Sequence, residues 1–384
     1  MSFLFDYGTL RLTWWLLLGV LLIGFAVMDG FDLGVAALIP WVGRNDVERR
    51  IAINAIGPVW EGNQVWLILG AGAIFAAWPP LYAVAFSGFY PAMFIALVAL
   101  ILRPVGFKFR SKVEHPLWRS TWDWTLTVGG AAAALVFGVA VGNALEGAPF
   151  AFDQDLRASY HITLIGLLNP FALLAGLVSL AMLVMHGAAY LGVKADEPVA
   201  GRARRAGRAA ALATIVMFAI GGLAVAFVVK GYRVVSAIDP SAPSNPLGKT
   251  VEQGTGLLLA NYGLHPWTLA APILGFAGAA LAFLLLASSR RPAAALLATS
   301  ASVIGIVATA GVSMFPFLLP SSSSPSSSLT VWDASSSRLT LAIMLVSVVM
   351  FVPIVLAYTA WVYYALRGRV TAQGVADGGH GGAY

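Results

Sequence analysis

The chain has 384 residues, of which 59% are hydrophobic and only 10% charged, and its formal net charge is +6. A soluble domain is about a quarter charged, so this composition excludes a soluble globular protein, and it excludes intrinsic disorder more firmly still. There are no cysteines, so disulfides, thiolate metal sites and cysteine nucleophiles are also excluded.

Nine stretches are long and apolar enough to cross a bilayer core of about 30 Å as helices. In chain order they cover residues 14–39, 51–78, 81–102, 124–142, 162–190, 209–230, 267–287, 293–317 and 339–366. We therefore expect an all-α integral membrane protein, a single polytopic domain over residues 1–384. The first ten residues lack the basic segment of a secretory signal, so the first helix should be retained.

Basic residues predict the orientation of these spans. Most of the 23 lysines and arginines lie in the loops after odd-numbered spans and after the last span. By the positive-inside rule the N-terminus is outside and the C-terminus, with a tail over residues 370–384, is cytoplasmic. This topology accounts for the net charge, so no nucleic-acid partner is expected.

Two segments outside the spans need a separate interpretation. The Ser-rich outer loop before the last span is either a flexible linker or, because Trp332 and Asp333 interrupt the serines, an ordered loop packed on a partner. The terminal run ADGGHGGAY is predicted to be a disordered tail.

Ionisable groups inside the membrane are the candidate functional residues, because each costs roughly 2.5–3.5 kcal/mol to insert. Three acids fall well inside a predicted span: Asp29, Asp32 and Glu61. Asp29 and Asp32 are three residues apart and share one helical face. Asp29 should lie about 15 Å from the cytoplasmic end of its helix, and Glu61 at a similar depth on the antiparallel neighbour.

The second predicted span is the least apolar and provides a polar setting for Glu61. Asn54, Glu61 and Gln64 follow helical spacing, and Pro58 leaves the carbonyl of Asn54 free to accept from water. Such a row can hold a file of water that conducts protons from the cytoplasm. The supporting polar residues of this hypothesis are Asp32, Asn54, Trp60, Asn63 and Gln64.

A plainer alternative is that the acids pair with arginine or lysine, or cap loops, and only hold helices together. It carries most weight for Asp32, which lies nearer the membrane edge. It carries less for Asp29 and Glu61, because no basic residue falls inside a predicted span and Arg103 is assigned to the loop after the third.

The histidines argue against a heme held by this chain alone. His186 is the only histidine within a predicted span, and His161 begins the same span on its outer side. A six-coordinate heme needs two axial ligands at matched depth, whereas these two lie toward opposite membrane surfaces. We expect no metal site and no catalytic residue in this chain.

Four runs of sequence carry a resemblance to a known family. They are GFAVMDGFDLG, GPVWEGNQVWLILGAGAIFAAWPPLYAVAFSGFYPAM, RPVGFKFRSK and MFPFLLPSSSSPSSSLTVWDASSSRLTL. They closely resemble subunit II, the heme-free subunit of the cytochrome bd-type quinol oxidases. The likeness extends from the first span to RGRVT near the C-terminus.

The resemblance implies a respiratory complex in the bacterial inner membrane, with a larger subunit I that carries heme b, a second heme b and heme d. That complex oxidises quinol on the outer side and reduces O₂ to water with cytoplasmic protons. The resemblance also implies nine helices arranged as two four-helix bundles and one peripheral helix. The first bundle would cover about residues 1–142, the second about 160–320 and the last helix about 338–366.

The family assigns two acids to a proton path at the subunit interface, and here they are Glu61 in the W-(D/E)-G-N motif and Asp29 before G-F-D. Some members also hold a structural quinone in this subunit, but nothing in this sequence places one. The expected partners are subunit I, quinol reached through the complex, lipid and, in some complexes, a small single-helix accessory subunit.

Two other hypotheses stay open. A proton-coupled carrier using the same acids would show inverted repeats with interrupted helices, and none is visible. A scaffold would use its buried acids only to bind its partner, so that losing Asp29 would lower complex yield and not the rate per heme.

Overall fold

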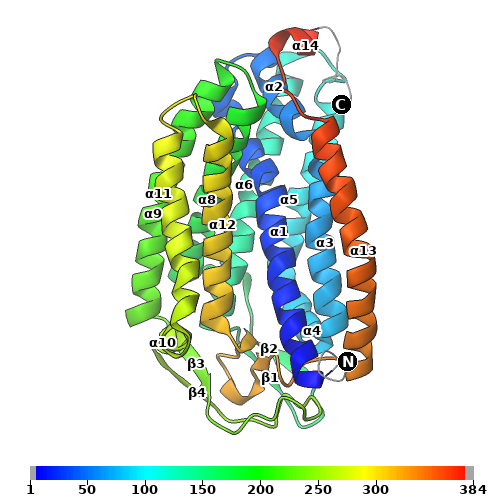
Figure 1. The fold of residues 1–384 in the computed structure, drawn as a ribbon, viewed down its shortest axis with the longest axis vertical. Coiled ribbons are helices and arrows are strands. Elements are labelled where there is room, and N and C mark those ends of the chain that lie inside the picture. The colour runs from blue at the N-terminus through cyan, green and yellow to red at the C-terminus, as the bar shows by residue number, and fades with distance from the viewer. Residues whose placement is uncertain (1–5, 377–384) are drawn as a thin grey trace.

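Long apolar runs form long helices, and in the computed structural model, which describes residues 6–376, they run side by side along one axis (Figure 1). The α-helices are α1 (Tyr7–Val42), α2 (Asp46–Ile56), α3 (Trp60–Ala77), α4 (Pro79–Gly88), α5 (Tyr90–Phe109), α6 (Pro116–Glu146), α7 (Leu164–Leu167), α8 (Pro170–Lys194), α9 (Val199–Phe227), α10 (Ala260–Leu264), α11 (Ala270–Leu285), α12 (Pro292–Met314), α13 (Arg338–Ala365) and α14 (Ala372–Ala376). Short 3-10 helices are η2 (Leu257–Leu259), η3 (Pro266–Leu269) and η4 (Pro325–Ser327).

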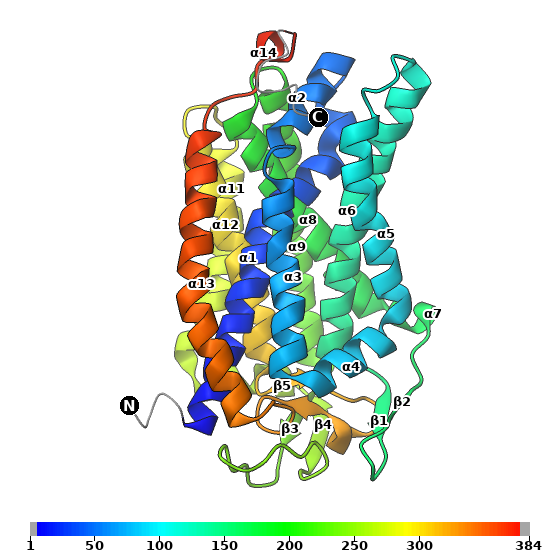
Figure 2. The same cartoon turned by 90° about the vertical axis from the view of Figure 1, so that its right-hand side faces the viewer.

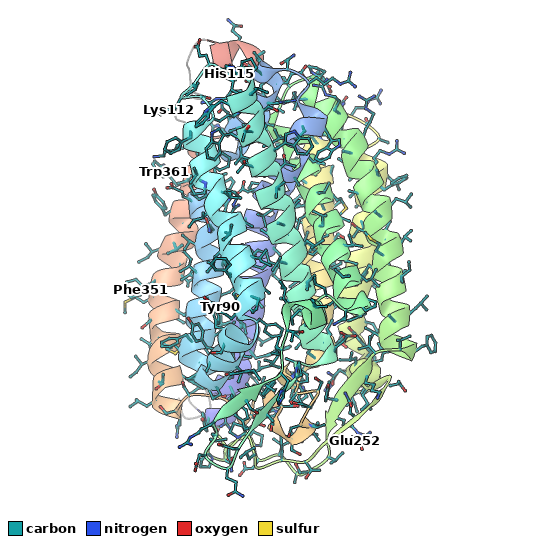
Figure 3. The ribbon with its side chains drawn as sticks, turned by 180° about the vertical axis from the view of Figure 1, so that it is seen from behind. Tyr90, Lys112, His115, Glu252, Phe351 and Trp361 are labelled. Atoms are coloured by element: carbon teal, nitrogen blue, oxygen red, sulfur yellow. The ribbon has the colours of Figure 1, made fainter. Side chains whose placement is uncertain are left out.

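Six short strands pair as three antiparallel hairpins at the end of the bundle where the chain begins (Figure 2). They are β1 (Phe150–Phe152), β2 (Ala158–Tyr160), β3 (Lys230–Val234), β4 (Val251–Thr255), β5 (Phe317–Leu319) and β6 (Leu329–Thr330). In the longest hairpin Lys230 pairs with Thr255 and Val234 with Val251. The labelled residues of Figure 3 mark the two ends: Lys112 and His115 lie at one, and Glu252 lies at the other.

Among the described residues, eight helical segments are long and apolar enough to cross a membrane. They are α1, α5, α6, α8, α9, the segment Pro266–Leu285, α12 and α13. The 18-residue helix α3 is not among them, and its first turns carry Glu61, Asn63 and Gln64. An all-α membrane protein is therefore confirmed, whereas the count of nine spans and the division into two four-helix bundles stay predictions.

Two predicted spans are broken in the structure. The region predicted as one span over residues 51–78 is two helices. Helix α2 ends at Ile56, the chain turns around Pro58, and α3 begins at Trp60. A proline there cannot donate the helical hydrogen bond, and in this chain the result is a full break. The span predicted over 81–102 divides at Phe89 into α4 and α5, and α5 continues to Phe109. The assignment of Arg103 to a loop is therefore wrong.

Helices α1 and α8 cross at the centre of the molecule, and glycine makes the approach close. A Cβ added at Gly34 would lie 1.9 Å from the backbone oxygen of Leu183, and one at Gly187 would lie 2.4 Å from the backbone nitrogen of Val35. Small residues permit such contacts between membrane helices. Because α1 is central, every residue from Asp29 to Ile39 is buried.

Helix α13 is the outlying element, at the edge of the bundle beside α3 (Figure 1). Phe351 and Trp361 are 59% and 62% exposed, and in Figure 3 their side chains point away from the bundle. After α13 the chain crosses back, and the backbone N–H of Val370 donates to the carbonyl of Lys194 at 2.7 Å. The predicted disordered run lies outside the described residues except for Ala376.

The Ser-rich loop is ordered against other parts of the same chain, which decides against the flexible linker. The backbone N–H of Ser336 donates to the carbonyl of Ala77 at 2.8 Å, and Ser328 is fully buried. The ammonium of Lys249, from the loop after β3, lies 2.9 Å from Oδ2 of Asp333. An ion pair thus joins two loops that the sequence separates widely.

This ion pair predicts a pH-dependent stability. Burial raises the pKa of Asp333 above its ordinary value, and Lys249 opposes that rise. In Lys249→Met the folded-state pKa of Asp333 moves further above its unfolded value. We therefore expect a loss of stability that is large at about pH 8 and shrinks toward pH 5 as Asp333 binds a proton. Thermal unfolding of the purified variant at both pH values measures it.

The matched control is the double variant Lys249→Met with Asp333→Asn, which has no carboxyl to titrate and should lose this pH dependence. A destabilisation by Lys249→Met that is equal at both pH values would contradict the assignment.

Candidate functional site

A fully buried ion pair joins the centre of α1 to α5. The guanidinium of Arg103 donates to both carboxyl oxygens of Asp29, at 2.8 and 3.0 Å, and both side chains are 0% exposed. The two parallel hydrogen bonds make this the geometry in which arginine and carboxylate bind most strongly. The expectation that no basic residue would lie inside a span is thus wrong for Asp29, because α5 extends past Arg103.

Asp32 lies one turn further along α1 and begins a second chain of contacts. The amide of Asn63 on α3 donates to Oδ2 of Asp32 at 2.8 Å, and the hydroxyl of Tyr363 on α13 donates to Oδ1 of Asn63 at 2.7 Å. Asp32 is 0% and Asn63 2% exposed. Side chains of α1, α3 and α13 are therefore joined by a chain of hydrogen bonds that ends at the carboxyl group of Asp32.

Several buried polar atoms around these residues have no hydrogen-bond partner within the described part of the chain. Four belong to this region: Oδ1 of Asp32, Nδ2 of Asn54, Nε1 of Trp60 and Nε of Arg103. Trp60 is part of the same cluster, because the guanidinium of Arg103 lies 6.0 Å from the centroid of its ring. Buried polar groups are almost always satisfied, by ordered water where the protein offers no partner, so this region is suited to bind internal water.

The charge of the cluster is unbalanced when both carboxyl groups are ionised. Asp29 and Asp32 lie one turn apart on α1, and the cation Arg103 contacts Asp29, whereas the hydrogen-bond partner of Asp32 is the Asn63 amide. A buried charge without a counter-charge is costly, so the charge-balanced state of this cluster carries one proton on its two carboxyl groups together.

Glu61 is not part of this cluster. It is exposed on α3, and it has no hydrogen bond or ion pair with any described residue, while Gln64 is partly buried on the next turn. Exposed Val65, Ile68 and Phe75 follow Glu61 at helical spacing and form an apolar stripe along α3. Because α2 and α3 are separate helices, Asn54 does not continue the face of Glu61 as the sequence had predicted.

His186 has no free ring nitrogen for a metal. Nδ1 lies 2.9 Å from the hydroxyl of Thr299, and Nε2 lies 2.9 Å from the carbonyl of Val27, so the ring joins α8 to α12 and α1. Within residues 6–376 no group of three or more metal-ligating side chains is gathered. An axial heme site does not fit at this histidine.

Two residues of the cluster were not found from the sequence. Arg103 begins the segment RPVGFKF after an apolar run, and Pro104 and Gly106 in that segment disfavour a helix, so no local signal indicated that α5 continues to Phe109. Tyr363 lies 300 positions from Asn63 along the chain, and no local pattern connects them.

Comparisons with known proteins agree on one family. A sequence profile described as "Cytochrome bd terminal oxidase subunit II" matches residues 10–366. The chain is 49% identical over 375 residues to "Cytochrome bd-I ubiquinol oxidase subunit 2" of Escherichia coli (strain K12), covering 98% of this chain and 99% of that one. It is 31% identical to "Cytochrome bd ubiquinol oxidase subunit 2" of Bacillus subtilis (strain 168), covering 93% and 96%.

A solved structure shares the fold. One chain of the bd oxidase from Geobacillus thermodenitrificans superposes with a TM-score of 0.66, covering 93% of this chain and 99% of that chain. At 17% identity this likeness is evidence for the fold alone.

The buried ion pair predicts that the protein loses stability when one of its two charges is removed and recovers it when both are removed. Arg103→Gln leaves the carboxylate of Asp29 buried without a cation, and we expect a loss of about 3–5 kcal/mol of stability. The yield and thermal midpoint of the purified protein measure it. The double variant Asp29→Asn with Arg103→Gln removes both charges and should recover most of the loss.

Arg157→Gln is the control, because that arginine is 79% exposed. If the double variant were as unstable as Arg103→Gln, the loss would come from packing of the Arg103 side chain and not from its charge.

Proposed function

We propose a role for this chain, which belongs to the cytochrome bd terminal oxidase subunit II family and is a subunit of a quinol:oxygen oxidoreductase. In this proposal the chain stabilises the heme-bearing subunit I and provides a cytoplasmic proton path through Glu61 and Asp29. The observation that carries this proposal is the buried cluster of two carboxyl groups, one guanidinium and four unpartnered polar atoms. A purely structural ion pair needs neither the second carboxyl nor the unpartnered polar atoms around it.

The exposed position of Glu61 supports a place at the subunit interface. A carboxyl on an apolar stripe facing lipid would cost roughly 2.5–3.5 kcal/mol, so a partner that covers the stripe gives it a better environment. The heme-bearing subunit I is the partner that membership of the family implies. Glu61 would pass protons at this contact, and Asp29 with Asp32 would hold one behind it.

Charge at the two ends of the bundle supports the orientation. Near α2 and the start of α6, Arg49 and Arg110 share Asp123, while Arg110 and Arg119 share Asp46, so arginines outnumber the acids they contact. An excess of basic groups is typical of the cytoplasmic side. We infer that α2 and α14 face the cytoplasm and that the N-terminus and the strands face outward.

The redox chemistry belongs to the partner. Heme b, the second heme b and heme d supply electron transfer and oxygen binding in subunit I, and both nitrogens of His186 are already used in this chain. The residues of this chain would position water, hold a proton at a carboxyl group and exclude water and O₂ from other routes. Quinol is reached through the complex, and no residue here is assigned to a structural quinone or to an accessory subunit.

The scaffold hypothesis has one observation in its favour, because Asp29 is fully paired with Arg103. If the acids only hold the complex together, Asp29→Asn lowers the amount of assembled oxidase but leaves the rate per heme unchanged. Because Asp29→Asn also leaves the guanidinium of Arg103 buried without its carboxylate, both hypotheses expect less assembled oxidase. The proton-path proposal alone expects a lower rate per heme.

Glu61 provides the sharpest test of the path. In Glu61→Gln the side chain keeps its size and hydrogen-bonding capacity but cannot carry a proton. We expect an assembled, heme-loaded complex whose oxygen consumption is lower by roughly a hundredfold, the scale of a lost proton-transfer group. Oxygen-electrode rates per heme d measure it.

Glu114→Gln is the matched control, since Glu114 is an exposed acid in the loop before α6. Normal turnover of Glu61→Gln would show that the proton path does not use this residue.

A further inference from the structure

Tyr363 is a polar contact from a helix that otherwise presents apolar residues to the outside. Helix α13 exposes Phe351, Tyr358 and Trp361, yet the hydroxyl of Tyr363 points inward and donates to Oδ1 of Asn63 at 2.7 Å. Asn63 is 2% exposed, so this hydrogen bond forms away from bulk water.

The contact determines which way the Asn63 amide faces. A primary amide has an oxygen that accepts and a nitrogen that donates. Since the hydroxyl of Tyr363 occupies the oxygen, the nitrogen is directed at Oδ2 of Asp32, 2.8 Å away. Without that hydroxyl the amide could turn by half a rotation and present its oxygen to Asp32, where it would accept from a protonated carboxyl.

The position of Tyr363 is itself fixed at both ends of α13. Near one end the indole N–H of Trp14 donates to the carbonyl of Leu341 at 2.9 Å. Near the other, the ammonium of Lys194 donates to the carbonyls of Leu366 at 2.6 Å and Gly368 at 3.2 Å. The outer helix is therefore held in register with α1 and α8, and its tyrosine cannot slide along Asn63.

We propose that Tyr363 is a positioning residue of the oxidase, whose hydroxyl locks the Asn63 amide so that its nitrogen faces Asp32 and leaves Oδ1 of Asp32 open to water. The role deepens the proposed proton path, because it names the group that decides how Asp32 holds its proton. It also gives the peripheral helix a part in the buried cluster.

Other groups surround the same carboxyl and define the background of the test. Asp29 and Arg103 lie one turn away on α1 and α5, and they form a complete ion pair with each other. The hydroxyl of Tyr190 on α8 is committed to the carbonyl of Ala55 at 3.1 Å. Neither contact involves Tyr363, so its removal acts on Asp32 through Asn63.

The test compares Tyr363→Phe with Tyr358→Phe in the assembled oxidase. Both variants remove one hydroxyl from α13, but Tyr358 is 63% exposed and its hydroxyl makes no hydrogen bond with a described residue. Infrared difference spectra between the oxidised and reduced complex report on carboxyl groups, and the bands that Asp32→Asn removes belong to Asp32. Oxygen consumption per heme d is measured on the same preparations.

We expect the bands of Asp32 to shift in Tyr363→Phe and to stay unchanged in Tyr358→Phe. Turnover of Tyr363→Phe should fall about two- to tenfold, the rate change that one ordinary hydrogen bond corresponds to, with heme content unchanged. Unshifted bands of Asp32 in Tyr363→Phe would overturn the proposal, and so would the absence of any band that Asp32→Asn removes.

The result also separates this inference from the proton path on which it rests. Normal turnover of Asp29→Asn and Glu61→Gln together with a shift in Tyr363→Phe would refute the path but support the positioning role. Lowered turnover in those variants with no shift in Tyr363→Phe would do the opposite.

Discussion

A charge buried in a helical bundle needs a counter-charge, and α1 buries two carboxyl groups one turn apart against a single guanidinium. Arg103 balances Asp29 with two hydrogen bonds and leaves Asp32 with an amide as its partner. Most of the local structure follows from this excess of one carboxyl group over the single guanidinium. The helix α5 has to continue beyond its apolar stretch to deliver the arginine, and α3 has to begin where its asparagine can reach Asp32.

The break between α2 and α3 allows Asn54 to be buried while Glu61 is exposed. Asn63 faces inward and Glu61 outward on the same helix, two residues apart, so α3 presents one polar group to the cluster and another to its surroundings. A continuous helix through Pro58 would have aligned Asn54 with Glu61 instead. The turn around Pro58 therefore separates an inner polar site from an outer one.

The sequence was sufficient for the membrane class, for the family and for the burial of Asp29 and Asp32, because apolar runs and the WEGNQVW motif are local signals. It was insufficient for their partners. Arg103 was assigned to a loop because a charge ends an apolar stretch in any hydropathy argument, although an arginine paired with an acid is tolerated in the membrane interior. Tyr363 and Asn63 meet through tertiary packing alone, and no periodicity within either helix could connect them. The exposure of Glu61 depends on how α3 turns about its axis, which the break at Pro58 sets.

The central claim is that Asp29 and Asp32 hold one exchangeable proton beside a fixed guanidinium. The most direct measurement is proton uptake during a single turnover, in which the fully reduced oxidase is mixed with O₂ while a pH-indicator dye and heme absorbance are recorded together. In Asp32→Asn, which leaves the ion pair of Asp29 and Arg103 intact, the account predicts delayed proton uptake with an unchanged first step of heme oxidation. Proton uptake at the wild-type rate in Asp32→Asn would contradict it.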